Sequence, residues 1–113
     1  MGIAKPFRIK KSDEFQNVFD QHDSFANQYF VVYKYLNKES ENFRLGISVG
    51  KKVGKAHERV WVKRRIRKSI QDIINQLPKN LDLLVIARPI TKNKSQAEIT
   101  QQLLDVLKKA KLI

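Results

Sequence analysis

The chain has 113 residues, enough for one compact domain with a hydrophobic core and too few for two. It holds 23 Lys and Arg against 11 Asp and Glu, and the resulting net charge of +12 indicates a polyanionic partner, nucleic acid first and an anionic membrane surface second. The lack of cysteine excludes disulfides and cysteine-ligated zinc, and no apolar run approaches the roughly 20 residues of a membrane span. We therefore expect a single soluble, cytoplasmic domain comprising residues 1–113.

Residues 13–21 are predicted to form a short helix, because Ser12 is a favourable N-cap and acidic residues follow it in the first turn. Phe15, Val18 and Phe19 share one face of this helix. On residue type alone, both phenylalanines are interpreted as core residues, and contact with a ligand is the alternative.

Residues 27–36 and 43–49 are rich in β-branched and aromatic residues and are predicted to be the two strands of one hairpin. Alternation places four side chains of the first strand on one face: Tyr29, Val31, Tyr33 and Tyr35. The polar face of the second strand carries Arg44, Gly46 and Ser48. If the two sets lie side by side, the sheet presents an open face on which unpaired nucleotides can stack, and an ordinary solvated face is the alternative.

A basic, glycine-punctuated loop at 50–56 leads into a long helix that is predicted to run from about residue 56 to residue 77. The glycine spacing before the loop does not fit the phosphate-binding loop of nucleotide hydrolases, which excludes that activity. The helix carries an apolar stripe made by Val62, Ile66, Ile70, Ile73 and Leu77.

Cationic side chains cover the rest of the first three turns of this helix. Residues 44–68 contain ten basic residues and one acidic residue, which is nine of the twelve net charges of the chain. We interpret this face as a nucleic-acid-binding surface, and a solvated helix face is the alternative.

The chain is predicted to end with a strand and a helix, which makes the fold class α+β. Residues 81–90 form a short apolar run typical of a central strand, which Pro89 stops. Ser95 and Glu98 form a capping-box pattern at the start of the last helix. His22 and His57 have no paired nucleophile or metal-ligand spacing, so we expect binding rather than catalysis from the polypeptide itself.

Five segments, in this order, resemble the protein subunit of bacterial ribonuclease P, the ribonucleoprotein that removes the 5′ leader from precursor tRNA: "SDEFQNVF", "FVVY", "FRLGISVGKKVGKA", "R..VKR.IR" and "LVIAR". The resemblance implies an α/β sandwich with a central, mainly antiparallel four-stranded sheet, about three helices and a left-handed βαβ crossover. It also implies that the RNA subunit performs the cleavage with magnesium ions and that the protein alone binds no cofactor. The implied partners are the catalytic RNA and the 5′ leader, with no membrane and no small-molecule substrate.

The resemblance also implies two binding surfaces. The basic segment is expected to contact the catalytic RNA, and Arg59, Lys63, Arg64 and Arg67 fall on the basic positions of the family's helix signature. With its neighbours, this set is Lys51, Lys52, Lys55, Arg59, Trp61, Lys63, Arg64, Arg67 and Lys68. A cleft between the first helix and the open sheet face is expected to bind the leader. Its residues are Phe15, Phe19 and Tyr33, with Arg8, Ser48 and Arg88 as further candidates.

Val60 and Trp61 depart from the signature, which places Asn and Arg at these positions. A valine cannot donate a hydrogen bond to phosphate, whereas a tryptophan can stack on RNA in place of a salt link. The alternative function is that of a structural, ribosome-associated RNA-binding protein, which needs the charge but not the cleft.

Overall fold

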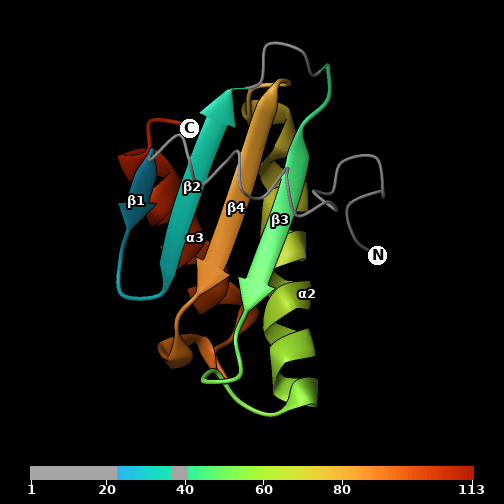
Figure 1. Cartoon of the computed structure of the whole chain (residues 1–113), viewed down its shortest axis with the longest axis vertical. Coiled ribbons are helices and arrows are strands. Elements are labelled where there is room, and N and C mark those ends of the chain that lie inside the picture. The colour runs from blue at the N-terminus through green and yellow to red at the C-terminus, as the bar shows by residue number, and fades with distance from the viewer. Residues whose placement is uncertain (1–22, 37–40) are drawn as a thin grey trace.

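The computed structural model describes residues 23–36 and 41–113, whose helices and strands are shown in Figure 1. In chain order the elements are β1 (Ser24–Ala26), β2 (Phe30–Leu36), β3 (Arg44–Val49), α2 (Ala56–Ile73), the 3₁₀ turn η2 (Ile74–Gln76), β4 (Leu81–Ala87), the 3₁₀ turn η3 (Pro89–Thr91) and α3 (Gln96–Lys109). The helix predicted at 13–21, with Phe15 and Phe19, lies outside the described residues, as does Arg8. Of the three expected helices, the described part of the chain therefore contains two.

The strands form one mixed sheet in the order β1-β2-β4-β3. β4 lies between β2 and β3, antiparallel to β2 and parallel to β3, and β1 is antiparallel to β2. The predicted hairpin between 27–36 and 43–49 is therefore wrong. Two of the three strand pairings are antiparallel and the third, between β3 and β4, is parallel, so the sheet is mixed. The physical reason is the composition of β4, in which all residues except Ile86 are buried. A strand that is apolar on both faces is stabilised most at the centre of a sheet.

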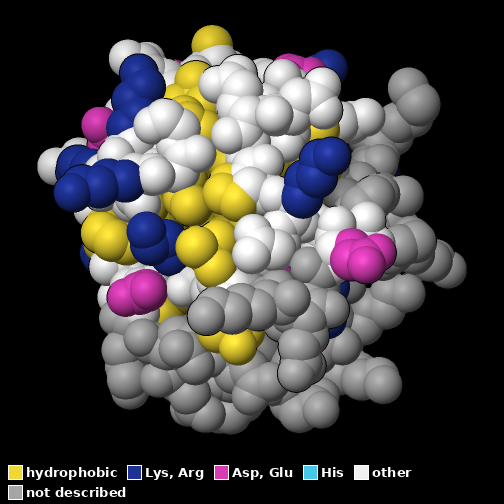
Figure 2. Space-filling view, turned by 90° about the horizontal axis from the view of Figure 1, so that it is seen from above, with side chains coloured by type: hydrophobic (Ala, Val, Ile, Leu, Met, Phe, Trp, Pro, Cys, Tyr) yellow, Lys and Arg dark blue, Asp and Glu magenta, His cyan; other side chains and the backbone are white. Residues whose placement is uncertain are grey.

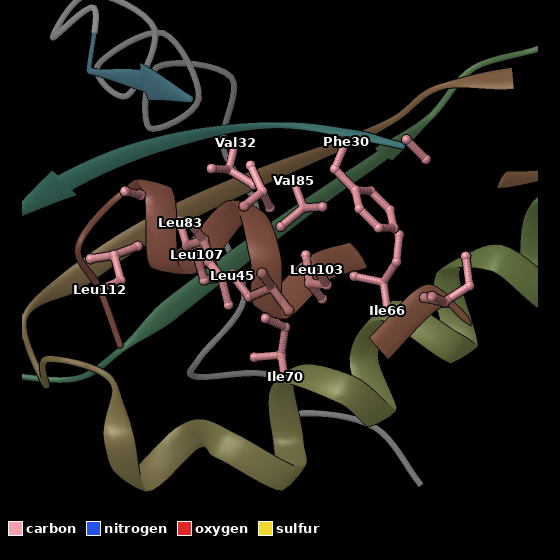
Figure 3. Close-up of a cluster of buried hydrophobic side chains, with 14 of the residues drawn as sticks. Phe30, Val32, Leu45, Ile66, Ile70, Leu83, Val85, Leu103, Leu107 and Leu112 are labelled. Carbon is pink, nitrogen blue, oxygen red and sulfur yellow. The ribbon is translucent and has the colours of Figure 1, made fainter. Parts of the chain in front are cut away.

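Both helices cover the same face of the sheet, behind it in the view of Figure 1. In Figure 3, Ile66 and Ile70 of α2 and Leu103 of α3 point towards the side chains of Phe30 and Val85 on the sheet. All five of these side chains are fully buried. The core between the sheet and the helices holds α2 in place, so the opposite side of α2 is available to a partner.

Helix α2 follows the predicted apolar stripe but ends earlier than predicted. Val62, Ile66 and Ile70 are buried as expected. The regular helix stops at Ile73, and η2 continues the turn as far as Gln76. Leu77 then has an extended backbone because the proline that follows it disfavours the helical conformation.

Helix α3 is capped at both ends by side chains. The hydroxyl oxygen of Ser95 accepts a hydrogen bond from the amide of Glu98 at 3.1 Å, which confirms the predicted N-cap. At the other end, the ammonium group of Lys34 on β2 donates to the carbonyl of Ala110 at 2.8 Å and lies 5.2 Å from the ring centroid of Phe25. A cation at a helix C-terminus is favourable, which explains a lysine on the core-facing side of β2.

Strand β1 was not predicted. A turn at Asn27 allows it to pair with β2. The side-chain oxygen of Asn27 accepts hydrogen bonds from the amides of Tyr29 and Phe30, at 2.9 Å each, and this Asx turn reverses the chain between β1 and β2. Tyr29 lies before β2, packs against the main core and donates its hydroxyl to the carboxylate of Glu98 at 3.3 Å. The prediction that Tyr29 and Tyr33 share a face of the sheet is therefore wrong.

Candidate nucleic-acid interface

The connection from β3 to α2 carries three exposed lysines, Lys51, Lys52 and Lys55. Val53 anchors this loop, since its side chain is only 2% exposed and its amide donates to the carbonyl of Gly50 at 3.0 Å. Figure 1 shows this anchored loop at the lower end of the molecule, where α2 begins.

Glu58, the one acidic residue of the basic segment, supports the start of α2. Its carboxylate accepts a hydrogen bond from the amide of Lys55 at 2.9 Å and lies 3.4 Å from the ammonium group of Lys92. The Lys55 amide, and then the charge of Lys92, hold the pKa of Glu58 below its ordinary value. A side chain at Gly54 would place its Cβ 2.7 Å from the same carboxylate, so this turn requires glycine.

The cationic face of α2 divides into three strips. The basic row consists of Arg59, Lys63 and Arg67, which recur every four residues and are half-buried. The crest consists of exposed side chains furthest from the core, and its members are Val60, Arg64 and Lys68. The third strip, made by Trp61 and Arg65, runs along the side of α2 that faces α3. The structure therefore places the predicted RNA-binding residues of α2 on different sides of the helix.

The third strip is fixed by contacts within α2 and with α3. The guanidinium group of Arg65 lies over the indole ring of Trp61, 5.3 Å from its centroid, and donates to the Trp61 carbonyl at 3.3 Å. Gln96 of α3 donates to the carbonyl of Arg65 at 2.9 Å, and the hydroxyls of Ser69 and Thr100 are 2.7 Å apart. Half of the Trp61 side chain remains exposed.

The cationic character of α2 fades after its third turn. Lys68 forms an ion pair with Asp72 at 3.0 Å, and both side chains are more than half exposed. An exposed pair of this kind leaves Lys68 able to exchange its partner for a phosphate.

The end of the molecule where α2 terminates has a different surface. Figure 2 shows this end, where hydrophobic side chains gather near the middle and both basic and acidic side chains are visible around them. A surface of mixed charge is typical of a solvated protein surface. The concentration of positive charge therefore belongs to the loop at 50–55 and to the first turns of α2.

The outer face of the sheet combines aromatic and polar side chains, as predicted, but on non-adjacent strands. Tyr33 and Tyr35 pack around Leu84, which is 1% exposed. The register aligns Tyr33 of β2 with Leu84 of β4 and with Gly46 of β3. The tyrosines and the polar residues of β3 thus share a face but are separated by β4.

Arg44 shares the outer face with Gly46, as predicted, and forms an ion pair there with Asp82 of β4. Its Nε donates to Oδ1 of Asp82 at 2.9 Å and its Nη2 donates to Oδ2 at 2.6 Å. The Asp82 side chain is only 2% exposed, so the two-pronged pair compensates a buried charge at the junction of β3 and β4.

The candidate leader-binding residues are only partly brought together. Tyr33 and Ser48 are on the outer face, in β2 and β3. Arg88 follows β4 and is one of the residues around a shallow hollow of about 520 Å³ near β1 and α3, together with Gln28 and Gln102. The remaining candidates, Phe15, Phe19 and Arg8, lie outside the described residues.

The sequence analysis did not include two residues of this region, Arg65 and Lys92, among the candidate site residues. Arg65 lies four residues after Trp61, a spacing that brings side chains together on a helix, and this signal was available. Lys92 approaches α2 only because β4 and η3 bring residues 88–95 next to Glu58. No local pattern could have indicated that contact.

The part of the chain that the structure describes contains no group of three or more His, Asp or Glu side chains placed to hold a metal ion. None of the helices described there has the length and apolar character needed to cross a bilayer.

Comparison with known proteins identifies the family. The sequence model of the Ribonuclease P family matches residues 3–111. The ribonuclease P protein component of Leuconostoc mesenteroides is 57% identical over 111 residues, which cover 98% of this chain and 96% of the relative. The corresponding protein of Oenococcus oeni is 53% identical over 110 residues, covering 95% and 90% of the two chains. The chain belongs to the ribonuclease P protein family.

Solved structures of ribonuclease P proteins share the fold. A mutant of the Staphylococcus aureus protein is 42% identical and superimposes with a TM-score of 0.90, covering 96% of this chain and 92% of the other. The Thermotoga maritima protein is 31% identical with a TM-score of 0.79, covering 90% and 96%. The fold of this chain is thus shared with ribonuclease P proteins of known structure.

Proposed function

We propose that this chain acts as the protein component of ribonuclease P, binding the catalytic RNA through the loop at 50–55 and the first turns of α2. The observation that carries the proposal is the concentration of cations on one helix, α2, of a chain that belongs to the ribonuclease P protein family. The basic row and the crest supply five cationic side chains: Arg59, Lys63, Arg64, Arg67 and Lys68. Cations on a rigid helix displace counterions from an RNA backbone and position that backbone.

The division of labour follows from what the protein surface can supply. The RNA subunit carries out hydrolysis with magnesium ions, and the protein contributes fixed positive charge. Lysine and arginine side chains neutralise phosphates that would otherwise require additional magnesium, so the protein's contribution is largest when magnesium is scarce. Such a role, on newly made precursor tRNA, belongs in the bacterial cytoplasm.

The most direct test is cleavage of precursor tRNA by a bacterial ribonuclease P RNA at low magnesium, with and without this protein. We expect the protein to accelerate cleavage and Arg64→Gln to reduce the acceleration. Lys108→Gln removes one charge from the exposed face of α3 and serves as the matched control. Cleavage at the same rate with and without the wild-type protein would refute the proposed function.

We propose further that the outer face of the sheet, beside Tyr33 and Ser48, receives the single-stranded leader. Aromatic rings next to polar groups suit unpaired nucleotides, and β4 keeps Tyr33 and Ser48 one strand apart on the same face. The whole chain, residues 1–113, would act as one domain with two RNA surfaces.

A series of precursor tRNAs with leaders of increasing length tests the second surface. We expect affinity for the holoenzyme to rise with leader length, and Tyr33→Ala to flatten that rise while leaving affinity for mature tRNA unchanged. Stacking on one ring is worth about 1–3 kcal/mol. A structural RNA-binding protein without a role in processing would show the same affinity for every leader length.

We also propose that the connection β3–α2–β4 has the left-handed crossover of the family. Two features support this: β3 and β4 are parallel neighbours, and α2 passes behind the sheet in Figure 1 while β4 lies to the left of β3 with both strands pointing down. Most such connections are right-handed, so this departure is distinctive. It places the basic face of α2 beside the edge strand β3.

A further inference from the structure

Trp61 is an exposed aromatic side chain among cations. Its side chain is 51% exposed, and that of the adjacent Val60 is 42% exposed. Large hydrophobic side chains in this state are few in the described residues, and the others, Leu36 and Ile90, lie on other elements. Neighbouring exposed apolar residues on a charged helix indicate contact with a partner.

Arg65 holds the indole ring in one orientation. Its guanidinium group covers one side of the ring at 5.3 Å and is tied to the Trp61 carbonyl at 3.3 Å. The same turn of α2 is joined to α3, because Gln96 donates to the carbonyl of Arg65 at 2.9 Å and the hydroxyls of Ser69 and Thr100 lie 2.7 Å apart. A ring whose orientation is already fixed loses little conformational entropy when a ligand stacks on it.

The position of Trp61 on α2 separates it from the basic row. At 100° per residue, Trp61 and Lys63 project about 160° apart around the helix axis. Arg64 and Lys68 of the crest lie between these directions, beside Trp61. An RNA strand whose phosphates contact Arg64 and Lys68 can therefore place a base against the indole ring of Trp61.

We propose that Trp61, held by Arg65, is a stacking platform for an unpaired nucleobase of the ribonuclease P RNA, with Arg65 as its positioning residue. This inference rests on the proposed function. A base is favoured over a lipid surface because the side chains around Trp61 are cationic, whereas the apolar stripe of α2, including Val62 and Ile66, is buried in the core. At this site, stacking takes the place of a charge contact.

The chain has a single tryptophan, so intrinsic fluorescence reports on Trp61 directly. We expect titration with a bacterial ribonuclease P RNA to quench this fluorescence and to protect the ring from acrylamide. Complex formation is followed independently by gel shift. A bound complex with unchanged fluorescence and unchanged acrylamide access would overturn the proposal.

Substitutions separate stacking from charge. Trp61→Leu is expected to weaken RNA binding roughly tenfold without changing its salt dependence, and Trp61→Tyr to restore most of the affinity. Lys108→Gln is the control for a change on a remote exposed surface. Wild-type affinity for Trp61→Leu would contradict the platform.

The role of Arg65 has its own readout. We expect Arg65→Gln to shift the emission of Trp61 in the free protein and to weaken RNA binding, and Arg65→Lys to rescue both in part because it retains the cation. An unchanged emission spectrum in Arg65→Gln would show that Arg65 does not position Trp61.

The outcomes distinguish this inference from the proposed function. If the wild-type protein binds the RNA and accelerates cleavage while the Trp61 variants behave like it, only the platform fails. If the wild-type protein does not bind the RNA, the proposed function fails. A fluorescence change with anionic phosphatidylglycerol vesicles, and none with RNA, would overturn the platform in favour of a membrane-surface site.

Discussion

At the scale of single residues, one carboxylate organises the start of the RNA-binding helix. Glu58 accepts a hydrogen bond from the amide of Lys55 and pairs with Lys92, while Gly54 leaves room for it. The sequence shows Glu58 only as an isolated acid in a basic segment. Its role depends on the distant Lys92, so a reading of local charge could not have predicted it.

This arrangement predicts a pH dependence of stability. The pKa of Glu58 is held below its ordinary value of 4.5, so its contribution is present above that value and is lost as the pH falls through the lower, folded-state pKa. We expect wild type to be more stable than Glu58→Gln at about pH 6 and the difference to shrink at about pH 3. Chemical denaturation at both pH values measures it. A difference that stays constant would contradict the assignment.

At the scale of elements, residue patterns predicted most strands and helices correctly but not how the strands pair. The stripe of Val62, Ile66 and Ile70 and the cap at Ser95 are local signals, and both are confirmed. Strand order is set by which strand is apolar on both faces, and 31 residues separate the end of β3 from the start of β4. Proximity in the sequence therefore favoured a hairpin that the burial of β4 rules out.

The junction of β3 and β4 depends on the ion pair between Arg44 and Asp82. We expect Asp82→Asn to lower the free energy of unfolding by about 2–3 kcal/mol, because it removes the buried negative charge that accepts two hydrogen bonds from Arg44. Asp72→Asn is the matched control, since its pair with Lys68 is exposed and is worth less than about 1 kcal/mol. Equal effects in urea denaturation would show that the buried pair does not stabilise the junction.

At the scale of the whole molecule, the position of the positive charge matters more than its total. The basic segment identified from the sequence is one surface at the start of α2, and the other end of the molecule has mixed charge (Figure 2). The sequence located the cations because they are contiguous. Helical spacing groups these cations into rows, but which row faces α3 and which is exposed depends on where α3 packs.

We propose that the cations of α2, and not the net charge of the protein, determine binding to ribonuclease P RNA. The decisive measurement is the affinity for that RNA over a range of monovalent salt concentrations. We predict that the double variant Lys63→Gln, Arg64→Gln reduces the steepness with which the logarithm of the association constant falls with log salt by about 2. The double variant Lys108→Gln, Lys109→Gln is expected to leave this slope unchanged. Equal slopes for the two double variants would contradict the claim.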